Sequence, residues 1–137
     1  MAATYGALGD HEKQLEYNLK ALGILEKKLP PDHPDLARSY SNVAVTYGAL
    51  GDHEKALEYD LKALGIREKK LPSDNPDLAT SYNNIGIAYY YLRDCQRSLE
   101  YLEKALAICE KKLPAGHPRT ESTRRSIAAV KKRLEKS

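Results

Sequence analysis

Apolar residues recur at helical spacing along most of the chain. Between residues 34 and 50 they mark one face of a helix: Leu36, Tyr40, Val43, Ala44, Tyr47 and Leu50. This spacing matches the ~3.6 residues per turn of an α-helix. Residues 52–71 instead carry two adjoining apolar stripes, with Leu57, Leu61 and Leu64 beside Ala56, Tyr59, Ala63 and Ile66. A helix with two apolar stripes packs between two neighbours, so the pattern predicts helices that bury one another.

Proline, glycine and capping residues mark the predicted helix ends. Pro34 suits the first position of a helix, where no N–H donor is needed. Gly51 suits a left-handed stop, and Asp52 then caps the following helix. Arg93 takes the place of Gly51 one repeat later, so an unchanged turn would make Arg93 left-handed at a cost of roughly 1 kcal/mol. Seven helices and no strand are predicted, with the helices near 1–8, 10–29, 34–50, 52–71, 76–92, 94–113 and 118–135.

The whole pattern repeats every 42 residues. Gly9-Asp10-His11-Glu12-Lys13 returns as residues 51–55, and Leu29-Pro30 returns at 71–72 and 113–114. Residues 4–39 and 46–81 are identical at 30 of 36 positions. Neither helix of such a repeat can bury its stripe alone, so the pairs must stack on one another. The sequence therefore predicts an all-α fold, an α-solenoid of stacked antiparallel helix pairs.

The repeat also predicts the domain organisation. Residues 118–137 start like another first helix but lose its apolar pattern, as expected of a capping helix. Met1 aligns with Val43, so the chain begins inside a repeat, and we interpret it as a piece of a longer array or a trimmed form. A single domain is expected, comprising a truncated repeat (1–33), two repeats (34–75 and 76–117) and the capping helix (118–137).

The incomplete first repeat predicts exposed apolar surface near the N-terminus. Residues 1–8 can cover only about half of the helix that follows, which should leave Leu15, Leu19 and Leu22 under-covered. Exposed apolar surface favours association. We therefore expect this end to fray or to be covered by another copy of the chain.

The residues of the first helices are similar to a known repeat family. Tyr82-x2-Ile85-Gly86-x2-Tyr89 resembles the tetratricopeptide template Trp-x2-Leu-Gly-x2-Tyr. The 42-residue period and strings such as Asp-His-Pro-Asp-Leu-Ala (32–37) most resemble the kinesin light chain type of this repeat. The family's aromatic residue in the second helix is replaced here, and we expect the neighbouring Tyr17, Tyr59 and Tyr101 to compensate. The resemblance implies an α-superhelix whose concave face, built from first helices, holds short peptides or partner segments.

Helical spacing selects the candidate concave-face residues. Asn side chains carry two donors and an acceptor, which suits an extended peptide backbone. In the resembled family an Asn at the place of Asn42 and Asn84 often has this role, although such amides can instead bond to neighbouring helices. Tyr90 and Tyr91 would either clamp an apolar side chain or fill a gap against the last helix. The candidate peptide-binding residues are Arg38, Asn42, Val45, Asn83, Asn84, Ile87, Tyr90, Tyr91, Arg125, Lys132 and Arg133.

The charge distribution favours an acidic partner. The chain carries +3 overall, with +5 in residues 115–137 and −2 in the remainder. A basic end beside a groove attracts acidic peptides, although the same helix could simply keep the end of the array soluble. No aromatic residue interleaves with these cations and no nucleic-acid-binding motif occurs, which argues against nucleic acid.

Other classes of function lack support in the sequence. No phosphate-binding loop, zinc-protease motif or nucleophile elbow occurs, so we expect no enzyme, cofactor or metal. Cys95 and Cys109 would lie roughly 21 Å apart on one helix and cannot bond to each other. The longest uncharged stretch has 15 residues, which excludes a membrane span, and two cysteines favour the cytosol. We expect a non-catalytic module that binds short, extended, acidic peptides, or alternatively an array fragment that mainly self-associates.

Overall fold

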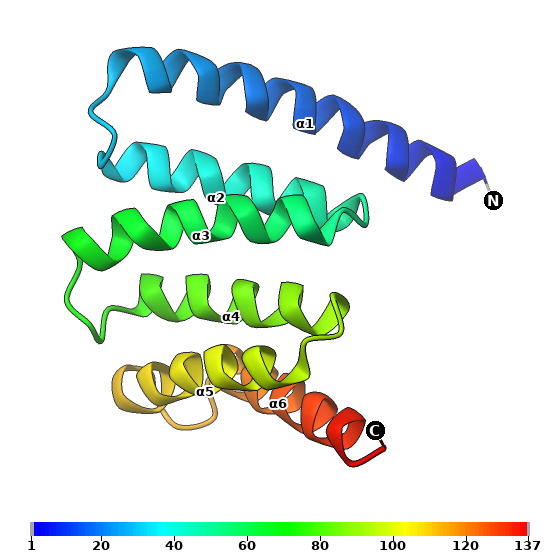
Figure 1. Cartoon of the computed structure of the whole chain (residues 1–137), viewed down its shortest axis with the longest axis vertical. Coiled ribbons are helices and arrows are strands. Elements are labelled where there is room, and N and C mark those ends of the chain that lie inside the picture. Colours follow the sequence, from blue (N-terminus) through cyan, green and yellow to red (C-terminus); the bar gives the residue numbers. More distant parts are fainter. Residues whose placement is uncertain (1, 137) are drawn as a thin grey trace. The chain divides into compact units, whose positions relative to one another are not determined.

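The computed structural model describes the backbone of residues 2–136 and the side chains of residues 9–136. This part of the chain is built from α-helices joined by short turns and contains no strand (Figure 1), which confirms the predicted all-α class. Its six helices are α1 (Ala2–Lys28), α2 (Pro34–Ala49), α3 (His53–Lys70), α4 (Pro76–Tyr91), α5 (Cys95–Lys112) and α6 (Pro118–Lys136).

The predicted turn at Gly9-Asp10 is wrong, because α1 runs without a break from Ala2 to Lys28. The two helices expected at 1–8 and 10–29 are therefore one helix, and residues 2–136 form six helices rather than seven. Gly51, at the equivalent position, has a φ of 85° and ends α2, whereas Gly9 is not left-handed. A segment of only seven residues gains little by folding back, so continuing the helix is the cheaper way to satisfy its backbone hydrogen bonds.

The chain divides into two compact units, Met1–Lys69 and Lys70–Ser137. Within each unit, successive helices run in opposite directions (Figure 1). The core of the first unit joins α1, α2 and α3 through one buried cluster of Leu22, Leu36, Ala37, Val43, Ala63 and Ile66. In the second unit, Cys95, Leu102, Ile127 and Val130 form the cluster between α5 and α6.

Gly86 brings α4 close to α5 in the second unit. A Cβ atom at Gly86 would lie 2.7 Å from Cγ of Leu102, a side chain that is 0% exposed. The hydroxyl of Ser98 donates a hydrogen bond of 2.6 Å to the carbonyl of Gly86. The two helices therefore meet at a position where only glycine leaves room for leucine.

The capping predicted at Asp52 and the left-handed turn predicted at Arg93 are confirmed. Asn75 also caps a helix, because it accepts a hydrogen bond of 2.9 Å from the backbone N–H of Asp77 at the start of α4. Asp52 accepts one of 3.2 Å from the N–H of Lys55 in the first turn of α3. Arg93 has a φ of 67°, the left-handed conformation predicted for a residue that replaces glycine in this turn. Local residues thus specify the starts of α3 and α4 and the turn after α4.

Tyrosines fill the space between first and second helices. Tyr59 stacks on Tyr47 with ring centroids 5.8 Å apart, and Tyr101 stacks on Tyr89 at 5.7 Å. The predicted compensation for the missing family aromatic is confirmed at Tyr59 and Tyr101. Tyr17 does not take that role, because it is 73% exposed.

The apolar residues exposed on α1 differ from those predicted. Leu22 is 4% exposed and belongs to the core with α2, and the half-buried Leu15 packs against the same core. Leu19 is 36% exposed, while Tyr17 and Ile24 are 73% and 55% exposed. The prediction of exposure is therefore confirmed at Leu19 and wrong at Leu15 and Leu22, which pack against the core that α1 shares with α2.

Candidate peptide-binding site

A cavity of about 180 Å³ lies between α4 and α6 in the second unit. Its lining is mostly apolar, with Ile87, Tyr90 and Tyr91 from α4, Leu102 from α5, and Ser126, Ala129 and Val130 from α6. Pockets for drug-sized ligands and cofactors measure ~300–1,000 Å³. The cavity is therefore of a size for one amino-acid side chain rather than a whole small molecule.

The structure brings three of the predicted residues together at this cavity. Ile87 and Tyr90 are half-buried, and Tyr91 is 57% exposed at the surface. The rings of Tyr90 and Tyr91 meet edge to face with centroids 5.7 Å apart. Tyr90 and Tyr91 thus leave a cavity beside α6 instead of filling the gap completely.

Arg133 of α6 joins the end of α4 at the same place. Its guanidinium carbon lies 3.8 Å from the ring centroid of Tyr90, and its Nη1 donates a hydrogen bond of 2.8 Å to the Tyr90 carbonyl. The same carbonyl also accepts a hydrogen bond of 3.1 Å from the backbone N–H of Arg93, so Arg133 adds a second partner at the end of α4. Arg133 therefore positions Tyr90 in addition to supplying charge.

The two predicted amides on α4 have different surroundings. The side-chain oxygen of Asn83 accepts a hydrogen bond of 3.5 Å from the hydroxyl of Thr123 on α6. Asn84 is half-buried, and its side chain forms no hydrogen bond with the described part of the chain. Asn84 shares a face of α4 with Ile87 and Tyr91, which lie three and seven residues further along. Asn84 is the amide that remains available to a ligand.

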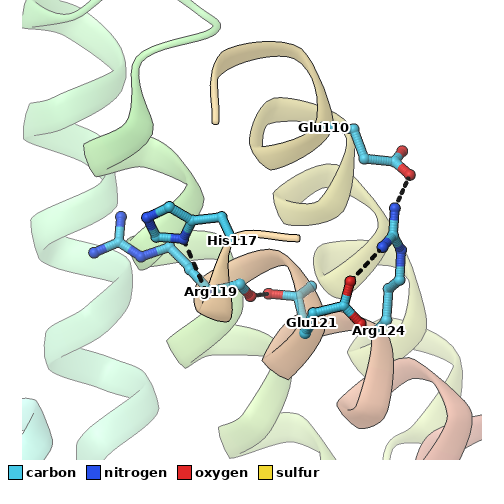
Figure 2. Close-up of polar contacts among 6 residues, drawn as sticks. Glu110, His117, Arg119, Glu121 and Arg124 are labelled. Atoms are coloured by element: carbon cyan, nitrogen blue, oxygen red, sulfur yellow. Dashed lines mark hydrogen bonds and ion pairs between the residues drawn. The ribbon is translucent and has the colours of Figure 1, made fainter. Parts of the chain in front are cut away.

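The cations of α6 also divide into engaged and available groups. Arg124 bonds to Glu110 and Glu121, at 2.8 Å in each case (Figure 2). Arg125 and Lys132 are exposed, and neither forms an ion pair within residues 9–136. The spacing of Arg125, Ala129 and Lys132 places all three on one face of α6, and Ala129 lines the cavity. Two available cations therefore share the helix face that borders the cavity.

The remaining predicted residues lie on α2 in the first unit. Arg38, Asn42 and Val45 are all exposed, with Val45 60% exposed. The backbone carbonyl of Asn42 accepts a hydrogen bond of 3.0 Å from the hydroxyl of Thr46, while its side chain stays at the surface. Their role in a shared groove with α4 stays a prediction from the sequence.

Asp60 is a buried carboxyl that the sequence pattern did not single out. It is 5% exposed, and burial raises its pKa to about 7, although the charge of Arg67 acts in the opposite direction. At the equivalent position, Asn18 donates a hydrogen bond of 3.0 Å to the hydroxyl of Thr46.

Among residues 9–136, no three His, Cys, Asp or Glu side chains are grouped as a metal ion would require. Cys95 and Cys109 are both buried and unbonded, and burial raises the pKa of the Cys109 thiol. Within residues 2–136, no helix combines the length and apolar character needed to cross a membrane.

Sequence reasoning did not identify Leu102 and Val130 as cavity residues. Both are almost fully buried, at 0% and 1% exposure, so their apolar character indicated core packing. The available signal was Leu102 itself, which stands where the two earlier second helices carry Asn18 and Asp60. This repeat position is polar in the two earlier second helices and apolar at Leu102, and the repeat with the apolar residue is the one that lines the cavity.

Comparisons with known proteins agree with this architecture. Two tetratricopeptide repeat family models match residues 1–69 and 78–119. A Podosopora anserina protein described as a kinesin light chain with nearly identical TPR-like repeats is 27% identical, with a TM-score of 0.85 over 94% of this chain. BtubC (BKLC) from P. vanneervenii is 26% identical, with a TM-score of 0.77 over 89% of this chain. The present chain spans 61% of the first structure's length and 48% of the second's.

A more distant similarity shows the fold alone. The TPR domain of Sgt2 from Aspergillus fumigatus is 23% identical, with a TM-score of 0.66 over 97% of this chain and 74% of that domain. A search among curated proteins finds no match to this chain.

Proposed function

Because the chain belongs to the tetratricopeptide repeat family, with repeats of the kinesin light chain type, we propose that it is a non-catalytic module binding short, extended, acidic peptides. Repeats of this kind generally serve as protein–protein interaction modules, since stacked helices present long binding surfaces. The cavity between α4 and α6 carries the proposal, because its lining and size suit one apolar anchor side chain. A cytoplasmic location fits the two unbonded cysteines.

Each element of the site has a separate task in this proposal. Ile87, Tyr90 and Tyr91 hold the anchor, and Asn84 bonds the extended backbone of the peptide. Arg125 and Lys132 attract carboxylates that flank the anchor. An unfolded peptide loses conformational entropy when it is ordered, so binding through one anchor is expected to be weak.

The test is a screen of short acidic peptides, each with one central apolar residue, followed by titration calorimetry with variants. Asn84→Ala should weaken every retained peptide by roughly 1–2 kcal/mol, the cost of losing hydrogen bonds to its backbone. Arg125→Glu should weaken acidic peptides selectively and reduce the salt dependence of their affinity. Arg119→Glu makes the same charge change in the first turn of α6 and is the matched control. Unchanged affinities in both Asn84→Ala and Arg125→Glu would refute the site.

A second candidate function is self-association. The observation that favours it is the exposure of Tyr17 and Ile24 on α1, at 73% and 55%. Sedimentation equilibrium at several concentrations tests it, because an associating chain shows a mass that rises with concentration. A monomer mass at every concentration would reject this function and leave peptide binding unaffected.

A further inference from the structure

The turn between α4 and α5 contains an arginine where the equivalent turn between α2 and α3 contains a glycine. Arg93 has a φ of 67° and Gly51 a φ of 85°. A left-handed backbone is unfavourable for a residue with a Cβ atom and costs glycine little. Strained residues of this kind are found preferentially at functional sites. The strain therefore points to a role for the Arg93 side chain outside the turn itself.

The Arg93 side chain borders a second cavity of the second unit, with a volume of about 560 Å³. The cavity is lined by the turn and the first residues of α5 together with the last turns of α6, namely Arg93, Asp94, Cys95, Gln96, Arg133 and Leu134. Arg93 is exposed, and its side chain forms no ion pair within residues 9–136. Its charge is therefore available to a ligand in this cavity.

The charges around the second cavity favour an anion. Arg133 donates its hydrogen bond to the uncharged carbonyl of Tyr90, so its positive charge is not neutralised by that bond. Asp94 is the one acidic residue in the lining, and its Oδ2 lies 3.7 Å from Nε of Arg97. Its Oδ1 accepts a hydrogen bond of 3.1 Å from the backbone N–H of the same arginine. Arg93 and Arg133 therefore border the cavity as two cations, while its own carboxylate is paired elsewhere.

Arg133 connects the second cavity to the α4–α6 cavity proposed to hold the peptide anchor. It lines the second cavity and contacts the ring of Tyr90, which lines the anchor cavity. Ala129, also in the anchor cavity, precedes Arg133 by four residues, or ~6 Å along α6. An extended peptide spans that length in about two residues, and residues two apart point to the same side. A peptide anchored beside Ala129 can thus direct its second neighbouring side chain toward Arg133.

We propose that the second cavity binds a carboxylate side chain of the peptide, two residues from the anchor, between Arg93 and Arg133. The inference rests on the proposed function and adds a second point of recognition to it. A guanidinium group suits this role, because its planar N–H donors match the geometry of a carboxylate. Arg133 is held in place by Tyr90, and Arg93 supplies the second charge from the strained turn.

Fluorescence anisotropy titrations of matched peptides test the carboxylate site. Each peptide has one apolar anchor and an amidated C-terminus, with aspartate or asparagine at the second residue before or after the anchor. At one of these two positions, the wild type should bind the aspartate peptide about three- to fivefold more tightly than the asparagine peptide. Arg93→Gly should reduce this preference below about twofold and leave binding of the asparagine peptide unchanged. Because glycine relieves the left-handed strain, the variant should remain folded.

Two further variants separate the site from general charge attraction. Lys131→Gln removes one positive charge from an exposed position of α6 outside the cavity and should keep the aspartate preference. Arg93→Lys retains the charge at the turn and should keep most of the preference.

The possible outcomes distinguish the carboxylate site from the anchor cavity. Equal binding of aspartate and asparagine peptides at both positions would overturn the carboxylate site alone. A preference that survives Arg93→Gly, or that Lys131→Gln reduces equally, would also overturn it and leave the anchor cavity intact. Failure of every peptide to bind the wild type would overturn the proposed function together with this inference.

Discussion

The side chain of Arg133 contacts both the ring and the backbone carbonyl of Tyr90. The guanidinium carbon lies 3.8 Å from the ring centroid, and Nη1 donates to the Tyr90 carbonyl at 2.8 Å. One side chain of α6 thereby fixes the last turn of α4 beside the cavity that both helices line. The stability of the second unit and the shape of its candidate site depend on the same contact.

Removing Arg133 should therefore affect stability. Arg133→Ala is expected to lower the free energy of unfolding by about 1–3 kcal/mol, because it removes a charged hydrogen bond and a cation–π contact. Lys132 is an exposed neighbour that forms no ion pair among the described residues. Lys132→Ala should therefore change the free energy of unfolding by less than about 0.5 kcal/mol. Urea denaturation, monitored by circular dichroism, measures the free energy of unfolding of both variants. Equal losses of stability in Arg133→Ala and Lys132→Ala would show that the Arg133 contact contributes nothing.

Gly86 should tolerate no side chain. In Gly86→Ala the new methyl group would meet Leu102 at 2.7 Å, and such overpacking costs about 1–3 kcal/mol. Gly65→Ala is the control, because Gly65 is an exposed helical glycine whose Cβ would meet nothing within 4 Å. That variant should gain up to ~1 kcal/mol from helix propensity. Thermal or urea unfolding should thus show that Gly86→Ala is less stable than the wild type and Gly65→Ala more stable. A Gly86→Ala variant that is more stable than the wild type would refute the close contact between Gly86 and Leu102.

Arg93 and Gly51 occupy equivalent left-handed turns, with φ of 67° and 85°. Arg93→Gly should stabilise the chain by about 0.5–1 kcal/mol, because the strain relieved exceeds the added freedom of the unfolded chain. Gly51→Arg should destabilise it by a similar amount. Urea midpoints of the two variants check this, and a loss of stability in Arg93→Gly would contradict it.

The buried carboxyl of Asp60 should make stability depend on pH. Its pKa of about 7 lies above the ordinary value of 3.8, so the folded chain keeps a proton that the unfolded chain releases. The contribution of Asp60 to the free energy of unfolding therefore falls as the pH rises from about 4 to about 7. Above about pH 7 this contribution stays constant. Asp60→Asn should remove this decline and stabilise the chain at pH 8 by on the order of 2–4 kcal/mol.

Urea unfolding of wild type and Asp60→Asn across that pH range measures the effect. Glu100→Gln, which neutralises an exposed carboxyl, is the control and should change the profile little. Parallel wild-type and Asp60→Asn profiles would show that Asp60 does not titrate as the structure indicates.

Local sequence signals predicted most of the fold, because each helix end depends on residues adjacent to it. Pro34, Gly51 and Asn75 determine their turns through backbone conformation and capping alone. The same reasoning failed at Gly9, where a glycine turn forms only if the preceding helix is long enough to pack back. The periodicity of α1 likewise could not predict which of its apolar stripes is exposed, because exposure depends on which helices pack against α1.

The sequence predicted only part of the candidate site, because helical spacing shows which residues share a face but not which residues contact one another. Helical spacing placed Ile87, Tyr90 and Tyr91 on one face, and the structure brings them to one cavity. Spacing could not show that Arg133 would bond to the Tyr90 carbonyl, since a long side chain reaches partners independently of helix periodicity. Nor could it separate Asn83, which contacts Thr123, from the available Asn84.

The most direct test of the central claim is methyl NMR of the chain during titration with an acidic peptide retained from the screen. The account predicts concentration-dependent shifts at the methyl groups of Ile87, Ala129 and Val130, and none at Ile24 and Leu61 in the first unit. A peptide that binds and leaves the cavity methyl groups unshifted would contradict the assignment of peptide binding to the α4–α6 cavity.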